Sequence, residues 1–324
     1  MELRQRTRRF GGKVMVCALL LRLMAGGVPA RVVSWLTGAN IVPLMIFLET
    51  GRDVRFSASS GKEKAPHVAE SPAPFIPRVI PTFSREETVA VTYGTSVRPA
   101  FGELVERPLK WDLTGDEPTV LILHTHTTES YSGEDYTPSG EYRTLEEGYN
   151  MLSIGDEVVR VLEEQGIRAV HDRTLHDHPS YNGAYSHARR TTQELLDQYP
   201  SIRLVLDIHR DALETGNSQL RTHAKVKGED SAQLMLVMGT EAGGLQHEKW
   251  EENLALALKL QLQLERRNKG ITRPINLRSQ RFNQDLSPGA LLVEVGAAGN
   301  TRGEALVAAR ELALAIADLA RGSG

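Results

Sequence analysis

Two histidines that directly follow a short apolar run have the types and spacing of metal ligands. Residues 120–123 are aliphatic and lie between Pro118 and polar residues, which predicts a buried strand because four residues are too few for a helical period. His124 and His126 follow at the carboxyl end of this strand, and their separation by two predicts that they share a face. A lone histidine there is usually structural, but Glu129 nearby favours a metal site, since carboxylates accompany or orient metal-bound imidazoles.

Two later apolar runs end in groups with the same chemistry. Residues 204–212 (LVLDIHRDA) predict a strand that ends in Asp207 and His209, again two apart and on one face. Residues 290–296 (ALLVEVG) place Glu294 near the end of a third strand, where an unpaired carboxylate is costly to bury. The ends of these strands are expected at one edge of a parallel sheet, beside the first two histidines. A buried carboxylate that faces a metal-activated water can act as a general base, and this is the role that we predict for Glu294.

The rest of the folded part supplies the elements that must position these residues. A short strand at 167–171 follows the first predicted helix and completes a βαβ unit with the strand at 120–123. The sequence therefore predicts an α/β fold, a mostly parallel sheet with flanking helices, in one domain over residues 86–324. Amphipathic patterns place the four helices at 150–165, 185–199, 251–267 and 302–319.

Weaker signals lie between these elements. Residues 220–226 and 232–239 resemble two strands joined by a turn at 228–230, which predicts a hairpin. Residues 271–286 are rich in arginine and poor in apolar side chains, so we expect a surface loop with a strand fragment at most. Four further histidines share no face and are expected to be surface or packing residues, namely His171, His176, His178 and His187.

The first 85 residues differ in composition from the rest. A basic leader precedes the apolar run 14–21, and this order predicts a cytoplasmic N-terminus and an exported remainder. We expect an uncleaved, single-pass membrane anchor near 14–36, within a leader and anchor segment at 1–48, with a cleaved signal peptide as the alternative. Residues 49–85 are rich in Pro, Ser and Lys and predict an extracytoplasmic linker.

The composition argues against two other classes of site. The net charge is −3, whereas proteins that bind nucleic acid usually carry a strongly basic surface, so nucleic acid is not an expected partner. Cys17 is the only cysteine, which excludes an intrachain disulfide and a cysteine-based zinc site. A metal ion must therefore be held by His, Asp or Glu.

Five segments of the chain are more particular than the strand and helix patterns. They read LHTHTTESY, NMLSIGDEV, LVLDIHRDA, GTEAGGLQHEKWEENLALALKLQ and LLVEVGAAGNT, and they lie within the region of roughly residues 119–319. Together they resemble the stage II sporulation protein P family of peptidoglycan hydrolases, whose basic leader, apolar anchor and Pro-rich linker are also similar to the first part of this chain. The resemblance implies a zinc-dependent N-acetylmuramoyl-L-alanine amidase fold with an added endopeptidase activity on peptide cross-links.

The resemblance also implies partners and site residues. It makes peptidoglycan the substrate and stage II sporulation proteins D and M the partners, during engulfment in the septal space of the sporulating cell. Carried over residue by residue, it makes one histidine of HTH and His209 the zinc ligands, and Glu294 the catalytic carboxylate. In related amidases the ligand follows the strand by a few residues, which favours His126 over His124.

The third zinc ligand stays open at this point. Related amidases carry a glutamate ligand just before the helix that begins here near Asn150. Glu146, Glu147 and Asn150 all lie near the aligned position, and Glu129 is a rival.

Two other classes of function are alternatives. LHTHTTESYSG also resembles the first motif of polymerase and histidinol phosphatase-type phosphoesterases, in which HxH opens a multimetal barrel. That barrel needs several more His and Asp clusters at later strand ends, and only DIHRDA and LLVEVG qualify here. The remaining alternative is a catalytically weak wall-binding scaffold of the engulfment complex.

Overall fold

The computed structural model describes residues 68–70, 78–81, 88–109, 111–133, 141–215 and 218–322. All of them belong to one compact unit of the chain, Lys64–Gly324. The predicted leader and anchor at 1–48 lie outside the described residues. No helix in the described ranges is long and apolar enough to cross a bilayer.

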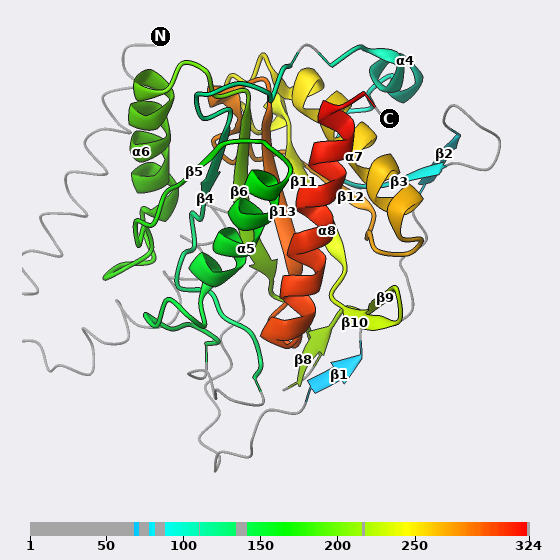
Figure 1. Cartoon of the computed structure of the whole chain (residues 1–324). Coiled ribbons are helices and arrows are strands. Elements are labelled where there is room, and N and C mark those ends of the chain that lie inside the picture. Colours follow the sequence, from blue (N-terminus) through cyan, green and yellow to red (C-terminus); the bar gives the residue numbers. More distant parts are fainter. Residues whose placement is uncertain are drawn as a thin grey trace, which may run out of the picture. The chain divides into compact units, whose positions relative to one another are not determined.

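An eight-stranded sheet forms the centre of this unit (Figure 1). Its neighbouring strands run parallel except at the pairs β2–β3 and β11–β13, so five of its seven pairings are parallel. The predicted α/β fold with a mostly parallel sheet is present. Across the sheet the order is β2 (Arg78–Pro81), β3 (Thr88–Gly94), β12 (Ile275–Arg278), β11 (Leu234–Gly239), β13 (Ala290–Ala297), β6 (Leu204–Asp211), β4 (Val120–Leu123) and β5 (Ala169–His171).

Helices cover the two faces of the sheet unequally. On one face the apolar side chains of β4, β6 and β13 form a continuous core with α5 (Met151–Glu164), α7 (Trp250–Arg267) and α8 (Arg302–Ala320). On the other face α6 (Ala184–Gln198) packs over β5, β4, β6 and the start of β13. The ends of these four helices lie within one residue of the predicted ends. Because both faces of β4, β6 and β13 are covered, these strands are buried along their whole length.

Two helices begin beside the carboxyl ends of the central strands, and each is capped by a side chain. Asn150 accepts a hydrogen bond from the Leu152 backbone N–H and so begins α5. Thr301 and Glu304 form a capping box that begins α8. These caps satisfy backbone donors that would otherwise be buried without partners, and they fix where both helices start relative to the strand ends.

Two weaker expectations were wrong. The hairpin consists of β9 (Ala224–Val226) and β10 (Glu229–Ser231), while Leu234–Gly239 is β11 of the large sheet. Lys227 and Gly228 both have positive φ, which suits a tight hairpin turn placed earlier than expected. Residues 275–278, expected to be a fragment within a surface loop, form β12 between β3 and β11.

The remaining elements are short. A second sheet contains β1 (Val68–Glu70), β8 (Ser218–Arg221) and β7 (Glu214–Thr215), and single turns of helix lie at α4 (Phe101–Glu106), η1 (Glu241–Gly243) and η2 (Gln284–Leu286). Both β1 and β2 fall within residues 49–85, where an extended linker was expected. The division of the chain into leader, linker and catalytic domain stays a prediction.

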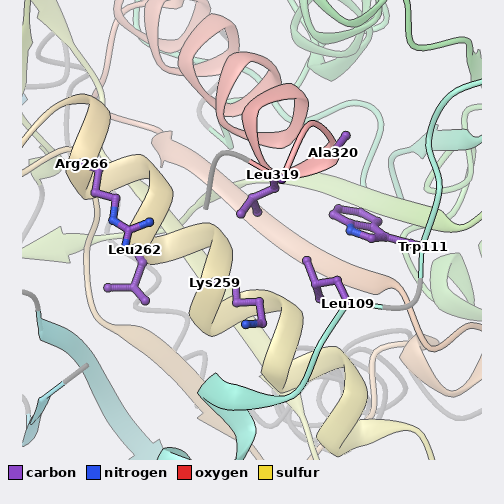
Figure 2. Close-up of a pocket in the computed structure, with 8 residues that line it drawn as sticks. Leu109, Trp111, Lys259, Leu262, Arg266, Leu319 and Ala320 are labelled. Atoms are coloured by element: carbon purple, nitrogen blue, oxygen red, sulfur yellow. The ribbon is translucent and has the colours of Figure 1, made fainter. Parts of the chain in front are cut away.

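A pocket of ≈ 350 Å³ lies between the ends of α7 and α8 and the segment that contains Trp111 (Figure 2). A larger cavity of ≈ 730 Å³ adjoins it through Leu109 and Trp111. Arg203 and Gly289 line this second cavity, and they directly precede β6 and β13. Both spaces therefore lie toward the amino ends of these strands, opposite the edge where the site residues were predicted.

Two helical glycines offer a test of how tightly α5 packs on the sheet. A Cβ at Gly155 would lie 2.6 Å from His124 Nε2 and closer still to His171 Nε2, whereas a Cβ at Gly102 would meet nothing within 4 Å. We expect Gly155→Ala to lower the free energy of unfolding by roughly 1–3 kcal/mol through overpacking. Gly102→Ala is the matched control and should raise it by up to about 1 kcal/mol, the helix preference for alanine. Urea unfolding measures both, and equal effects at the two positions would contradict the packing described.

Candidate active site

The pairing of β6 with β13 brings two of the predicted site residues together. The two strands are parallel and in register, with Glu294 directly opposite His209 and Leu292 opposite Asp207. Asp207 and His209 lie two apart on β6 and share a face, as predicted, and Glu294 lies beside them on the same face. All three side chains are buried. A basic group and two carboxylates are thus fixed at the carboxyl ends of two adjacent strands.

His126 joins this cluster because the chain turns after β4. Residues 125–128 form a turn that carries the imidazole of His126 to within 5.3 Å of the His209 ring, centre to centre, with the ring planes at 86°. Tyr181 stacks on the other side at 4.4 Å and its hydroxyl lies 3.1 Å from His126 Nε2. The Nδ1 atom of His126 is buried and makes no hydrogen bond within the described part of the chain.

The expectation that His124 and His126 share a face was wrong. The strand ends at Leu123, so the period-2 argument does not extend to His126. His124 lies on the α5 side of the sheet, under Gly155. Its Nδ1 lies 2.8 Å from the Ile208 carbonyl oxygen and its Nε2 lies 2.9 Å from His171 Nε2. Since a carbonyl oxygen only accepts, Nδ1 of His124 carries the proton in this contact.

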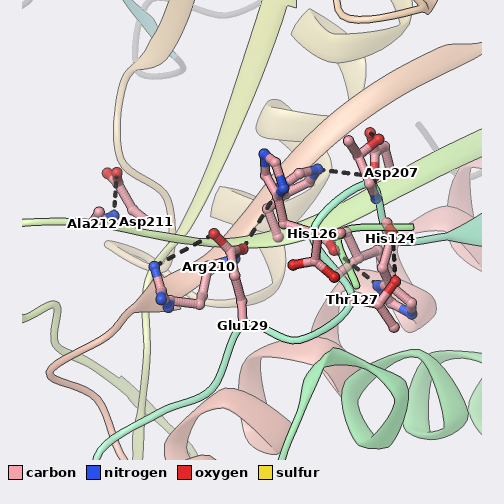
Figure 3. A network of polar contacts seen from close by, with 12 residues as sticks. His124, His126, Thr127, Glu129, Asp207, Arg210, Asp211 and Ala212 are labelled. Carbon is pink, nitrogen blue, oxygen red and sulfur yellow. Dashed lines mark hydrogen bonds and ion pairs between the residues drawn. The ribbon is translucent and has the colours of Figure 1, made fainter. Parts of the chain in front are cut away.

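Glu129 lies at the centre of a buried network of charges (Figure 3). Its carboxylate is 3.5 Å from the Arg210 guanidinium and 3.6 Å from His209 Nδ1, and it accepts a hydrogen bond from the Arg210 backbone N–H. Arg143 approaches the same carboxylate at 3.7 Å. Arg210 is itself buried and donates to the Ser130 and Tyr142 carbonyl oxygens. Glu129 therefore ties the strand end of β6 to the loop that follows β4.

The protonation states follow from these contacts. Burial lowers the pKa of His126 well below its ordinary value, so this imidazole is neutral at pH 7. Burial also acts to lower the pKa of His209, but the carboxylates of Asp207 and Glu129 outweigh it and hold the pKa of His209 well above its ordinary value. The pKa of Glu129 is lowered despite burial, because Arg210 and His209 favour its ionised form. The site thus holds a neutral imidazole beside a protonated one.

His209 has one carboxylate on each side of its ring. Its Nε2 lies 2.9 Å from Asp207 Oδ1, an ion-pair distance without the alignment of a hydrogen bond, and Nδ1 faces Glu129. Asp207 also accepts hydrogen bonds from the backbone N–H and the hydroxyl of Thr125. These bonds hold the turn that carries His126, so the same carboxylate positions both imidazoles.

The alternatives for a third ligand lie in different surroundings. Glu146 and Glu147 are exposed, and Glu147 forms an ion pair with Arg173. The Asn150 side chain is engaged as the cap of α5. Glu129 is the one of these four candidates that contacts His209.

The additional histidines take structural positions. His176 forms a buried contact with Asp172, His187 lies 3.0 Å from the His176 carbonyl oxygen, and His171 contacts His124 and Asp156. For these three the packing interpretation agrees with the contacts. His178 precedes Pro179 in a cis peptide bond and is exposed.

Sequence reasoning missed the aromatic residues around His126. Tyr181 stacks on one face of its ring, and Tyr185 meets it edge-on at 5.6 Å. The Arg143 guanidinium covers the outer face of Tyr181 at 4.5 Å, and it also pairs with the buried Asp177. The sequence carries no periodic signal for this pair, because Tyr181 lies before α6, which begins at Ala184.

The donor set suits a zinc ion in its chemistry. His126 Nδ1 is buried and makes no hydrogen bond within the described residues, although polar atoms buried in this way are normally satisfied. His209 Nε2 lies beside it in the same cluster and contacts the Asp207 carboxylate. Imidazole nitrogens with a carboxylate oxygen form a usual zinc ligand set. As the side chains stand, no three His, Cys, Asp or Glu in the described ranges are close enough together to hold an ion.

This fold and site define an α/β protein with buried imidazoles and carboxylates at the carboxyl ends of adjacent strands. The family described as stage II sporulation protein P matches residues 57–317. Since this is more than half of the chain, the protein belongs to the stage II sporulation protein P family. The stage II sporulation protein P of Bacillus subtilis (strain 168) is 28% identical over an alignment of 202 residues, and this alignment covers 58% of this chain and 47% of the relative. The chain thus spans about half the length of that relative.

Solved structures give more distant likenesses. An N-acetylmuramoyl-L-alanine amidase from Clostridium difficile 630 is 14% identical, with a TM-score of 0.37 over 64% of this chain and 97% of that one. The CwlD amidase from Clostridioides difficile, solved in complex with the GerS lipoprotein, is 14% identical, with a TM-score of 0.40 over 64% of this chain and 100% of that one. These values are too low to carry an argument about the site.

The raised pKa of His209 can be tested by neutralising its neighbour. In metal-free Asp207→Asn protein, loss of the carboxylate should lower the pKa of His209, which NMR titration of its ring protons measures. The raised pKa also sets how stability depends on pH. The ion pair of His209 stabilises the folded state fully below the pKa of histidine in the unfolded chain, and this stabilisation is lost as pH rises through the higher pKa of His209 in the folded state. Asp177→Asn is the control, because Asp177 pairs with Arg143 instead. An unchanged pKa in Asp207→Asn would remove Asp207 as the cause.

Proposed function

We propose that this protein is a zinc-dependent peptidoglycan hydrolase that cleaves the amide between N-acetylmuramic acid and L-alanine. The observation that carries the proposal is the register of β6 and β13, which places Glu294 directly opposite His209 on the face that His126 also reaches. Membership of the stage II sporulation protein P family supports peptidoglycan as the substrate. An amide hydrolase needs an electrophilic group and a nearby carboxylate, and this cluster supplies residues for both roles.

His126 and His209 would hold the zinc ion, with Glu129 as the proposed oxygen ligand or as the carboxylate that orients His209. His124 is the less favoured alternative, because both of its ring nitrogens contact other protein groups. When bound, zinc supplies Lewis-acid chemistry, polarising the amide carbonyl and making water a stronger nucleophile at neutral pH. His209 has to lose its ring proton before it can act as a ligand, so binding is expected to strengthen as pH rises.

Glu294 is proposed as the general base and then the general acid. It lies within the central strand β13 beside His209, so the position of its carboxylate relative to β6, which carries His209, is fixed. In this role it accepts the proton of the attacking water and passes it to the leaving amine of L-alanine. Tyr131, which donates a hydrogen bond to the Val295 carbonyl oxygen, fixes the backbone next to Glu294.

The cellular context is part of the same proposal. The catalytic domain would act outside the cytoplasmic membrane, held by the anchor at 1–48, in the septal space during engulfment in sporulation. Stage II sporulation proteins D and M are the proposed partners, and cleavage of peptide cross-links is a proposed second activity. Membership of the stage II sporulation protein P family supports the role in sporulation, and the location, the partners and the second activity are proposals.

The role of Glu294 is tested by a substitution that keeps its shape. Glu294→Gln should retain bound zinc but release no product from purified peptidoglycan, a fall in rate of at least about 100-fold for loss of a general base. Mass spectrometry of the digest measures free muramic ends and new L-alanine amines. Glu311→Gln is the control, since Glu311 on α8 is about as buried as Glu294 but pairs with Arg267 on α7. Activity retained in Glu294→Gln would remove this residue from the mechanism.

The same digestion separates the alternative functions. Wild-type protein should yield amidase products, and a chelator should abolish them. Phosphate release from a phosphoester with no wall products would favour the phosphoesterase alternative. Wall binding without products of either kind would favour the scaffold.

Zinc content distinguishes the two histidines of HTH. His126→Ala should weaken zinc binding by more than about 100-fold, whereas His124→Ala should weaken it by about tenfold or less, as expected of a residue that only supports the ligand strand. Zinc per folded protein, measured by elemental analysis after dialysis against a zinc buffer, gives the two affinities. Circular dichroism establishes that both variants are folded. The reverse order of effects would make His124 the ligand.

A further inference from the structure

A strained turn places an aromatic ring beside the candidate active site. Phe282 and Asn283 have consecutive φ values of 51° and 58°, in the left-handed region. Asn tolerates this region, but an aromatic residue there is a rare and unfavourable conformation. Backbone strain of this kind persists only where the surrounding structure enforces it, and it is concentrated at functional sites. The strained conformation at Phe282 therefore indicates that this residue has a role in function.

The surrounding structure holds this turn from two sides. Gln284 is buried and bonds to β11 through both of its amide atoms, accepting from the Gly239 N–H and donating to the Val237 carbonyl oxygen. On the α6 side, the Arg189 guanidinium donates two hydrogen bonds, of 2.8 and 2.7 Å, to the Asp285 carboxylate. The Asn283 side chain donates a third to the Tyr185 carbonyl oxygen. Two elements of the fold thus fix the turn in its strained form.

The turn lays the Phe282 ring on the sheet face that carries the site. The ring packs on Met235, Val237 and Leu292, of which Met235 is directly opposite Glu294 and Leu292 precedes Glu294 by two on the same face. The ring is half-buried, so part of it stays exposed to solvent. Phe282 therefore borders the position of the proposed general base.

Phe282 is also continuous with the rings around His126. Its ring centre lies 6.0 Å from that of Tyr185, and Tyr185 meets His126 edge-on. Tyr181 completes the series by stacking on His126. His126 and Arg143 already cover the Tyr181 ring, so we call Tyr185 and Phe282 alone the aromatic wall.

We infer that the aromatic wall is a subsite for a sugar ring, and that Phe282 sets the position of that ring relative to Glu294. The inference rests on the proposed function, because it assigns the muramic acid side of the substrate to this wall. Aromatic faces pack well on the C–H-rich face of a pyranose ring. Two cations lie next to this turn, Arg281 directly before Phe282 and Arg189 on α6, and both pair with Asp285. The wall therefore suits the uncharged sugar better than the peptide stem, whose carboxylates need cations.

Binding to two separate halves of the substrate tests this assignment. The Glu294→Gln protein, which leaves substrate intact, is titrated with the peptide-free disaccharide of N-acetylglucosamine and N-acetylmuramic acid, and separately with the free stem tetrapeptide. A second variant carries Phe282→Asn in addition. This substitution removes the aromatic ring, and asparagine tolerates the positive φ at this position. We expect it to weaken disaccharide binding by about tenfold or more and to change tetrapeptide binding by less than about twofold. Phe282→Tyr, the conservative control, should restore disaccharide binding.

Kinetics and stability complete the test. With Glu294 intact, Phe282→Asn should raise KM for peptidoglycan by about tenfold with kcat changed little. Loss of folded protein would instead lower the apparent kcat and leave KM unchanged. The melting temperature of each variant establishes that it is folded. Unchanged disaccharide binding, weakened tetrapeptide binding alone, or no disaccharide binding to the parent protein would each overturn the inference. Failure of the wild-type protein to cleave peptidoglycan would instead overturn the proposed function, and the disaccharide titration would still decide the role of Phe282.

Discussion

The parallel pairing of β6 with β13 is the interaction on which the site depends. It sets His209 and Glu294 side by side, and the register shifts directly after Glu294, before Ala297 pairs with Asp211. Gly296 lies in this irregularity with a φ of 69°, and a Cβ there would meet Ala232 and Asn300. The strand thus leaves regular pairing just beyond Glu294, the proposed general base, and bulges are common beside active sites. One residue of slip would turn Glu294 to the opposite face.

Burial of charge is the second constraint, and it follows from the first. Strand ends this deep in the fold cannot carry ionised groups unless each has a partner. Glu129 meets Arg210 and His209, and Asp207 meets His209 and Thr125. The charges are therefore linked in one network that joins β6 to the loop after β4. Removing any member leaves another member buried without compensation, so the network ties local stability to the geometry of the site.

Much of this arrangement was predictable from sequence, for identifiable reasons. The helices were found because long amphipathic periods with glycine or capped ends are strong signals. His209 and Glu294 were brought together by a simple rule about parallel strands. The shared face of His124 and His126 failed because Asp207, distant in sequence, accepts hydrogen bonds from Thr125 and helps turn the chain after Leu123. The aromatic wall was missed because Tyr185 and Phe282 are nearly a hundred residues apart and neither lies in a periodic pattern. Patterns within one helix or strand could be interpreted from the sequence, whereas contacts between loops that are distant in sequence could not.

The protonated ring of His209 has a consequence for how such a site comes into being. In the metal-free protein the proton on His209 already supplies the positive charge that keeps Asp207 and Glu129 together. This proton therefore offsets the repulsion between the two carboxylates, whereas some small domains stay unfolded until zinc is bound. Binding of the proposed zinc ion would exchange this proton for another cation at the same place. Assembly of the chain and delivery of the ion can then be separate events.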